Sequence, residues 1–235
     1  MRSGAIVAKM NTICFVEPPT LDAVLGGMAF QEHHDGERAA IVPEIKRRDG
    51  VPMASRAILV GQNGSTIRAH TRNLNRHFVA NPAIIQTVSE KTWRKDFQKT
   101  PPGAIILTEN VVRNIEAVVF IAVCDPEIVL RRFADSPRIG TNRKNYGAVS
   151  DVEWVDLPDM DTTGIIGQGQ LLRPVPRSKA DALGSFDSHT RFGFWQNPYH
   201  PAVAAKAGID AEPVCYPPDI IGAISVDDAL GYGLS

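Results

Sequence analysis

The sequence predicts an α+β domain whose elements follow the order β-α-β-β-α-β, because a strand-helix pattern occurs twice in the chain. Residues 5–15 form a β-rich apolar run, and residues 21–30 then carry apolar side chains at helical spacing. Residues 114–124 form a second apolar run, and residues 126–134 repeat the helical spacing with a proline in the first turn. With one further strand in each unit, this is the order of a ferredoxin-like (RRM-like) fold, whose sheet is a common RNA-binding platform.

The two remaining strands of this order are expected in the long middle of the chain and after the second helix. Residues 149–156 alternate between two side-chain faces and predict the last strand. A long insertion at about residues 41–110 separates the two units, and prolines divide it into strands and turns. We therefore expect a domain over residues 1–157 that contains this insertion, and an irregular extension over residues 158–235 that packs on the same domain.

The insertion contains a predicted hairpin with a basic strand. Residues 57–60 and 66–70 flank residues 62–65, where an Asn-Gly pair is typical of a hairpin turn. Arg68 and Arg72 share one face of the second strand, because alternate residues of a strand point the same way. Within the insertion, this strand face is the best candidate for binding a nucleic-acid backbone.

The net charge of −1 conceals a strong asymmetry along the chain. Residues 38–99 carry twelve Lys/Arg and four Asp/Glu, a net charge of +8, whereas residues 150–235 carry five and twelve, a net charge of −7. This polarity indicates a basic surface for nucleic acid and an acidic surface that faces solvent or another subunit. Two solvated faces without a binding role are the alternative interpretation.

A basic loop flanked by glycines precedes the last predicted strand. The loop combines two glycines, two cations and a tyrosine, namely Gly140, Gly147, Arg143, Lys144 and Tyr146. Glycines permit positive φ and close backbone approach, the cations supply charge, and the tyrosine ring offers a stacking face. The spacing fits neither a P-loop nor a dinucleotide fingerprint. We interpret the loop as a cradle for a polyanion, with an ordinary glycine turn as the alternative.

Composition and cysteine spacing set further limits. The 235 residues are 43% hydrophobic and 22% charged, which is typical of a globular protein with a sizeable core. No apolar run approaches 18 residues and the N-terminus lacks a signal-peptide pattern, so we expect a cytoplasmic protein without a membrane partner. Cys14, Cys124 and Cys215 are widely spaced and predict buried free thiols, and no metal or cofactor is expected.

These motifs together resemble a known family. The Gly-x-x-Arg-x-x-Tyr-Gly-x-Val motif at residues 140–149, the Leu-Asp-Ala-Val-Leu segment at residues 21–25 and the basic insertion are similar to those of CRISPR-associated RAMP proteins. The general likeness covers roughly residues 4–157. It is greatest to the small foot subunit of a Class 1 antiviral effector complex, especially that of type IV systems, and residues 195–199 and 214–218 also resemble that subunit more faintly.

The resemblance implies a subunit that holds the repeat-derived 5′ handle of the CRISPR RNA and caps the filament of backbone subunits. Its expected partners are therefore this RNA, the neighbouring backbone subunit and the large subunit, and contact with target DNA near its flanking motif is a further option. The residues expected to bind RNA belong to the glycine loop and the insertion: Arg138, Gly140, Arg143, Lys144, Asn145, Tyr146, Gly147, Lys46, Arg47, Arg48, Arg56, Arg68, Arg72 and Arg76.

Two other functions remain open for this sequence. Some members of the wider family cleave precursor CRISPR RNA without metal, and the residues here that such a ribonuclease would use are His33, His34, His70, His77 and Lys46. Exposed histidines after a helix are more often surface residues, so we expect no catalytic residue. The other alternative is a structural subunit that makes protein contacts only. Nucleic acid that copurifies at low salt and is lost at high salt would argue against it.

Overall fold

The computed structural model describes residues 1–14, 17–33, 42–61, 66–74, 105–139, 147–184, 186, 188–195 and 210–234. The chain divides into two compact units, one formed by Met1–Thr66 with Arg113–Ser235 and the other by Ile67–Val112. Both strand-helix patterns and the C-terminal segment belong to the first unit. Residues 42–61, which the sequence places in the insertion, also belong to it.

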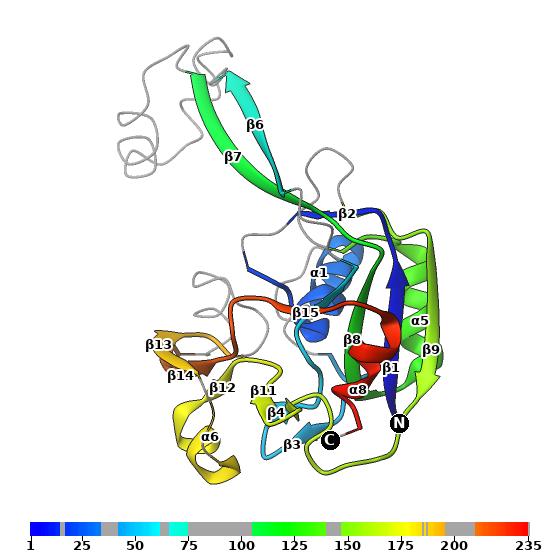
Figure 1. Cartoon of the computed structure of the whole chain (residues 1–235), viewed down its shortest axis with the longest axis vertical. Coiled ribbons are helices and arrows are strands. Elements are labelled where there is room, and N and C mark those ends of the chain that lie inside the picture. Colours follow the sequence, from blue (N-terminus) through cyan, green and yellow to red (C-terminus); the bar gives the residue numbers. More distant parts are fainter. Residues whose placement is uncertain are drawn as a thin grey trace. The chain divides into compact units, whose positions relative to one another are not determined.

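A five-stranded sheet organises the first unit (Figure 1). In spatial order its strands are β15 (Ile221–Ala223), β5 (Ile58–Val60), β8 (Ala117–Cys124), β1 (Arg2–Lys9) and β9 (Asp151–Asp156). β1 pairs antiparallel with β8 and β9, and β8 pairs antiparallel with β5, whereas β15 runs parallel to β5. The unit is therefore an α+β domain with a mixed sheet, which confirms the predicted class.

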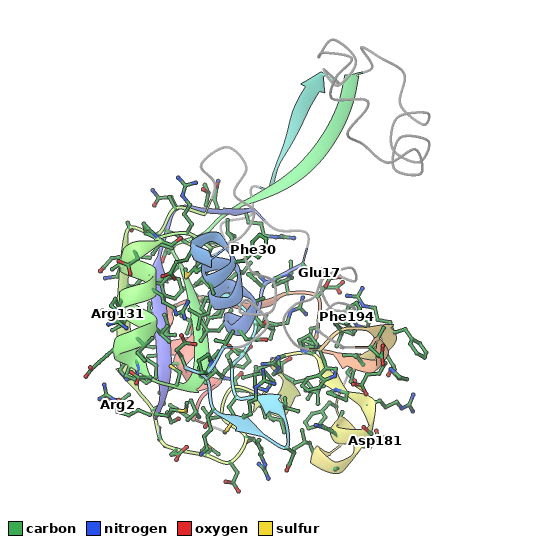
Figure 2. All side chains as sticks on the ribbon, turned by 180° about the vertical axis from the view of Figure 1, so that it is seen from behind. Arg2, Glu17, Phe30, Arg131, Asp181 and Phe194 are labelled. Atoms are coloured by element: carbon green, nitrogen blue, oxygen red, sulfur yellow. The ribbon has the colours of Figure 1, made fainter. Side chains whose placement is uncertain are left out.

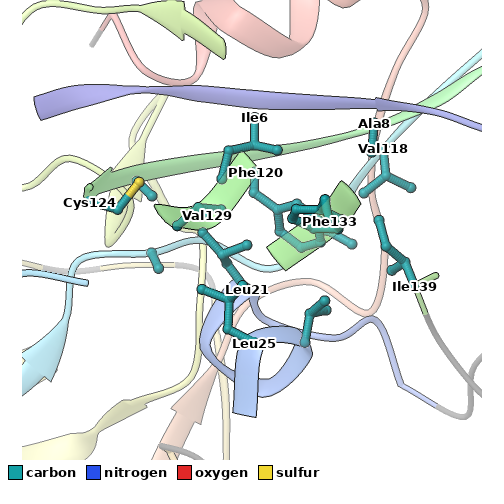
Figure 3. Close-up of a cluster of buried hydrophobic side chains, with 14 of the residues drawn as sticks. Ile6, Ala8, Leu21, Leu25, Val118, Phe120, Cys124, Val129, Phe133 and Ile139 are labelled. Carbon is teal, nitrogen blue, oxygen red and sulfur yellow. The ribbon is translucent and has the colours of Figure 1, made fainter. Parts of the chain in front are cut away.

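Two helices, α1 (Leu21–His33) and α5 (Pro126–Asp135), pack on one face of this sheet. Their contact with the sheet is made by apolar side chains that lie together in Figure 3, among them Leu21, Leu25, Val129, Phe133 and Phe120. The start of α5 is set by Asp125, whose carboxylate accepts hydrogen bonds from two backbone N–H groups of the first turn. Both predicted helices are confirmed.

The C-terminal segment covers the opposite face of the sheet. Ala229 of α8 (Val226–Gly231) packs in one cluster with Val7 and Ile121, whereas the neighbouring Ile6 faces α1 and α5. Because both faces are buried, β1 and β8 are apolar along nearly their whole length, without the polar alternation of a half-exposed sheet. The sheet face is consequently not an open platform on which RNA bases could stack.

The remaining described elements of the first unit are short. Three strands form a second sheet in the order β12-β14-β13. The bounds are β2 Thr12–Cys14, β3 Arg47–Arg48, β4 Val51–Pro52, β10 Ile166–Gly167, β11 Gln170–Leu171, β12 Val175–Pro176, α6 Arg177–Leu183, β13 His189–Gly193 and β14 Glu212–Tyr216. Cys124 and Cys215 are buried free thiols, as predicted, and the side chain of Cys14 lies outside the described residues.

A buried arginine connects the C-terminal segment to α1. Arg173 is 0% exposed, and its Nη1 lies 3.3 Å from Oδ1 of Asp22 in the first turn of the helix. The same guanidinium donates hydrogen bonds to the carbonyl oxygens of Pro52 and Ala54 at 2.8 and 2.9 Å, and to that of Trp195 at 2.8 Å. A buried guanidinium needs such a full set of acceptors, because desolvation of an unpaired charge is costly.

The second unit contains β6 (Thr66–Leu74) and most of β7 (Ile105–Asn114), which are neighbouring hydrogen-bonded strands. The sequence predicted instead that the run at 57–60 pairs with the one at 66–70. That prediction is wrong, because β5 lies in the five-stranded sheet and β6 in another sheet. The apolar side chains of β5 are fully buried between β15 and β8, and this burial outweighs the local turn preference. The predicted tip, residues 62–65, lies outside the described residues.

Candidate nucleic-acid interface

The base of the glycine loop is closed by backbone hydrogen bonds. Arg138 and Ala148 form an antiparallel bridge, and the N–H of Ile139 donates to the carbonyl of Gly147 at 2.9 Å. The N–H of Gly147 donates in turn to the carbonyl of Thr12 at 3.1 Å, just beyond β1. Ile139 is 1% exposed and packs in the cluster beneath α1 and α5. The two described segments that flank residues 140–146 are therefore paired with each other and anchored in the core.

Gly147 is required at this closure for a geometric reason. Its φ is +82°, in the left-handed region that residues with a Cβ rarely adopt. A Cβ at this position would also lie 1.9 Å from the carbonyl oxygen of Ile139. The sequence identified this glycine as one that permits close backbone approach, and the approaching group is the opposite strand of the loop base.

The charges next to the loop base are partly paired. Nζ of Lys9 lies 3.0 Å from Oδ2 of Asp151, and this hydrogen bond raises the pKa of the lysine and lowers that of the aspartate. Both groups are exposed, so water and salt screen the pair. Arg138 is also exposed at the entrance of the loop. At the loop base, Lys9 is therefore already engaged by an acidic neighbour.

The basic segment 46–48 lies at the other end of the sheet from the loop. Ile45 bridges to Cys124, which pairs with Arg2 at the start of β1, whereas Ser150 beyond the loop bonds to the carbonyl of Lys9 at its end. Seven residue steps of β1 separate these ends, a distance of about 23 Å at the usual rise of a strand. The base of the loop and this segment therefore do not form one compact site.

The two arginines of that segment hold local carbonyl groups. Nη1 of Arg47 donates to the carbonyl of Gly50 at 3.0 Å, and Nη1 of Arg48 donates to that of Asp161 at 2.6 Å. The second bond links β3 to the acidic segment after β9. Both guanidinium groups have further donors, since each carries five N–H groups.

Arg56 is placed differently from the other predicted cations. It is 5% exposed, and its Nε donates to the carbonyl of Pro18 at 3.2 Å. Its backbone forms an antiparallel β-bridge with Thr20, just before α1. The guanidinium therefore joins the segment before β5 to the segment before α1. No sequence pattern indicated this burial, because Arg56 stands among the charged residues of the basic stretch.

The other predicted binding residues lie outside what the structure describes. Gly140, Arg143, Lys144, Asn145, Tyr146 and Arg76 are among these residues, as are the side chains of Arg68 and Arg72. The same holds for the side chains of the candidate ribonuclease histidines His33, His34, His70 and His77. The described Lys46 belongs to the segment at the far end of the sheet.

A cavity beside the first turn of α1 was not anticipated from the sequence. It has a volume of about 510 Å³ and is lined by Glu17, Pro18, Pro19, Thr20, Ala23, Arg56, Pro174, Arg191, Phe192, Gly193, Phe194 and Tyr216. Glu17 and Phe194 on its wall are labelled in Figure 2. Its residues come from the segment 17–23, from Arg56 and from residues between 174 and 216, and no sequence pattern joins segments so far apart.

The described residues offer little to a covalent or metal-dependent reaction. Burial raises the pKa of the Cys124 thiol to about 12, so this thiol stays neutral and is a poor nucleophile. Within the described ranges no group of His, Cys, Asp and Glu side chains is arranged to hold a metal ion. Among the same residues, no helix is long and apolar enough to cross a membrane.

Comparison of the chain with models of protein families finds no match, and comparison with curated proteins finds none either. The resemblance to RAMP proteins therefore rests on the sequence motifs alone, and it stays a prediction.

Proposed function

We propose that the chain is an RNA-binding subunit of a CRISPR ribonucleoprotein complex, in which it holds the 5′ handle of the CRISPR RNA and caps the backbone filament. The proposal takes the first unit as a ferredoxin-like domain of the RAMP type. The order β9-β1-β8-β5, with all neighbours antiparallel and both helices on one face, supports this assignment. β15 and α8 are then additions to the basic fold.

The observation that carries the proposal is the closed base of the glycine loop. A seven-residue segment containing Arg143, Lys144 and Tyr146 leaves from two segments that Gly147 allows to approach each other closely. Anchoring both ends reduces the conformational entropy that the loop loses when it binds RNA. Phosphates would contact the two cations and the loop amides, and a base would stack on the tyrosine.

The burial of both faces of the five-stranded sheet limits where RNA could bind. With α8 over one face and α1 with α5 over the other, the five-stranded sheet offers RNA no open face, in contrast to the usual platform. The phosphate-binding role falls to the loop and to the unit of residues 67–112, which has a net charge of +4 from seven Lys/Arg and three Asp/Glu. Backbone and large subunits are the proposed protein partners.

The proposal is tested by isolating the tagged chain, coexpressed with its genomic neighbours and a CRISPR array, and sequencing the bound RNA ends. We expect uniform 5′ repeat-derived handles. Arg143→Ala/Lys144→Ala should reduce RNA retention and lower the slope of log affinity against log salt by about 1.4, because two phosphate contacts to a single strand are lost.

A matched control removes two exposed cations elsewhere, Arg131 of α5 and Arg177 of α6. The control variant Arg131→Ala/Arg177→Ala has the same net charge and should retain RNA as the parent does. Equal retention by both double variants would show that the loop does not bind the RNA. Precursor RNA that accumulates uncut only when His33, His34, His70 and His77 are changed to alanine would instead favour the ribonuclease.

A further inference from the structure

We propose that the cavity beside α1 binds one unpaired nucleobase of the RNA, an inference that rests on the proposed function. The cavity volume of about 510 Å³ falls in the range of small-ligand sites, which is about 300 to 1,000 Å³. Three aromatic residues, Phe192, Phe194 and Tyr216, contribute to its lining. Bases that have left a stack are commonly held between aromatic rings and guanidinium planes.

The tyrosine wall of the cavity is fixed before any ligand arrives. Tyr216 is 6% exposed, and its ring stacks on that of His189 with centroids 5.5 Å apart and an interplanar angle of 16°. Gly193 allows this position, because a Cβ there would lie 2.2 Å from the tyrosine hydroxyl. This wall is rigid and loses little entropy on binding, and because His189 and Arg191 already lie on the tyrosine ring, the base is left to stack on the phenylalanines.

The rim of the cavity offers a donor and an acceptor side by side. Arg191 forms an ion pair with Glu17, and its guanidinium carbon lies 4.1 Å from the centroid of the Tyr216 ring. Hydrogen bonding to Glu17 raises the pKa of Arg191, so the group stays charged. A nucleobase edge presents acceptors for the guanidinium and an amino group for the carboxylate.

The same rim argues against a phosphate as the occupant. The carboxylate of Glu17 is 54% exposed and neutralises Arg191, while Arg56, the other cation of the lining, is 5% exposed and donates to the carbonyl of Pro18, so the exposed charges at the rim form a neutral pair. A proline-rich peptide also packs on aromatic rings, but a proline side chain has no group to pair with either member of the ion pair. The observations therefore favour a base, with its phosphates left outside the cavity.

Phe192 lies on the edge strand β13, where its side chain points to the opposite face of the sheet from Tyr216, so its ring would turn around the strand edge to reach a base. Its side chain is 76% exposed, so no core packing holds the ring in place. Stacking against a base would remove this ring from water. Because the ring is so exposed, Phe192→Ala removes the stacking face without opening a hole in the core.

The test measures saturation transfer from the full-length chain to the base protons of adenosine, guanosine, cytidine and uridine. Nucleosides carry no phosphate, so this binding does not need the cations of the glycine loop, and its dependence on Phe192 distinguishes the cavity from a base stacked on Tyr146. We expect transfer to at least one nucleoside. Phe192→Ala should weaken its binding about five-fold or more, the lower end of measured base-aromatic stacking. Phe30→Ala, which removes a 46% exposed ring on α1 outside the cavity lining, should leave it unchanged.

A second measurement separates this inference from the proposed function. RNA containing 4-thiouridine is coexpressed with the complex, crosslinked, and mapped to peptides of the chain. Crosslinks to residues 189–194 or 213–216 support the base site. Crosslinks confined to the loop and residues 67–112, with no nucleoside transfer, overturn the inference and leave the RNA-binding function intact.

Nucleoside binding without any copurified RNA would support the base site and contradict the proposed function. Binding of a polyproline peptide that depends on Phe192, with no transfer to any nucleoside, would show that the cavity is a peptide site and overturn the inference.

Discussion

Two single residues, Gly147 and Arg173, each allow separate segments of the chain to pack against each other. Gly147 closes the loop base because the backbone there needs a positive φ and leaves no room for a Cβ. Arg173 holds the C-terminal segment against α1, since its buried guanidinium joins Asp22 to three backbone carbonyls, two at Pro52 and Ala54 and one at Trp195. These two residues make the most specific predictions.

Gly147→Ala should destabilise the first unit by about 2–4 kcal/mol, the sum of the left-handed backbone penalty and overpacking. Gly169→Ala is the matched control, because that glycine has φ +71° but no atom within 4 Å of the place that a Cβ would occupy. The control should cost about 1 kcal/mol, the backbone term alone. Chemical unfolding compares the two, and equal losses would contradict the steric explanation.

Arg173→Met should lower the free energy of unfolding by about 3–5 kcal/mol, because it leaves the Asp22 carboxylate and several carbonyls buried without their donor. Asp22→Asn in the same background should cost less than it does alone, with a coupling energy of about 1–3 kcal/mol. Denaturant unfolding of the two single variants and the double variant measures this coupling. Additive losses would mean that the ion pair contributes no specific interaction.

At the scale of elements, α8 decides which surface of the sheet is available. The helix starts with a capping box, in which Ser225 and Asp228 exchange side-chain and backbone hydrogen bonds. Through Ala229 it covers the sheet face opposite α1 and α5, together with Leu172. A short C-terminal helix thus closes the surface that the β-α-β-β-α-β pattern alone would leave open.

Deletion of residues 225–235 should expose this apolar face, so we expect strong binding of a hydrophobic dye and a lower unfolding midpoint. Ser225→Ala provides a graded comparison, because loss of the cap alone should cost about 1 kcal/mol without dye binding. A deletion variant that unfolds cooperatively at the parent's midpoint and binds no dye would show that α8 is not needed to cover the sheet.

At the scale of the whole molecule, the chain separates a folded support from a basic insertion. The unit of residues 67–112 is inserted in the sequence between the two parts of the first unit. Its net charge of +4 contrasts with the acidic C-terminal part of the first unit. If the insertion binds RNA as proposed, this division predicts that RNA binding and the stability of the first unit can be changed separately.

Replacement of residues 67–112 by a Gly-Ser linker should leave the first unit folded, because the core clusters of the described residues contain none from this segment. RNA retention should fall and become less salt-dependent, since seven cations are removed. Amide NMR spectra and RNA pull-down at several salt concentrations measure the two effects. Retention equal to that of the parent would exclude a role of the insertion in RNA binding.

Local sequence patterns predicted the elements that are long or strongly capped. Helices α1 and α5 were predicted from apolar spacing, and Pro126 marked the start of the second. The paired strand runs were also recognised, although β1 ends at Lys9 and β8 starts at Ala117, where the sequence suggested longer runs. The hairpin prediction failed because strand pairing depends on burial in the sheet, and turn residues do not report that burial.

The sequence by itself determined the α+β class, the helix positions and the glycine loop as a feature that needs Gly147, because each depends on local spacing or backbone conformation. Only the tertiary structure decided that β5 lies in the main sheet, that α8 closes its second face, and that Arg56 is buried. It also decided that segment 46–48 lies far from the loop and that Glu17 meets Arg191. These outcomes depend on contacts between residues distant in the chain, which local patterns do not encode.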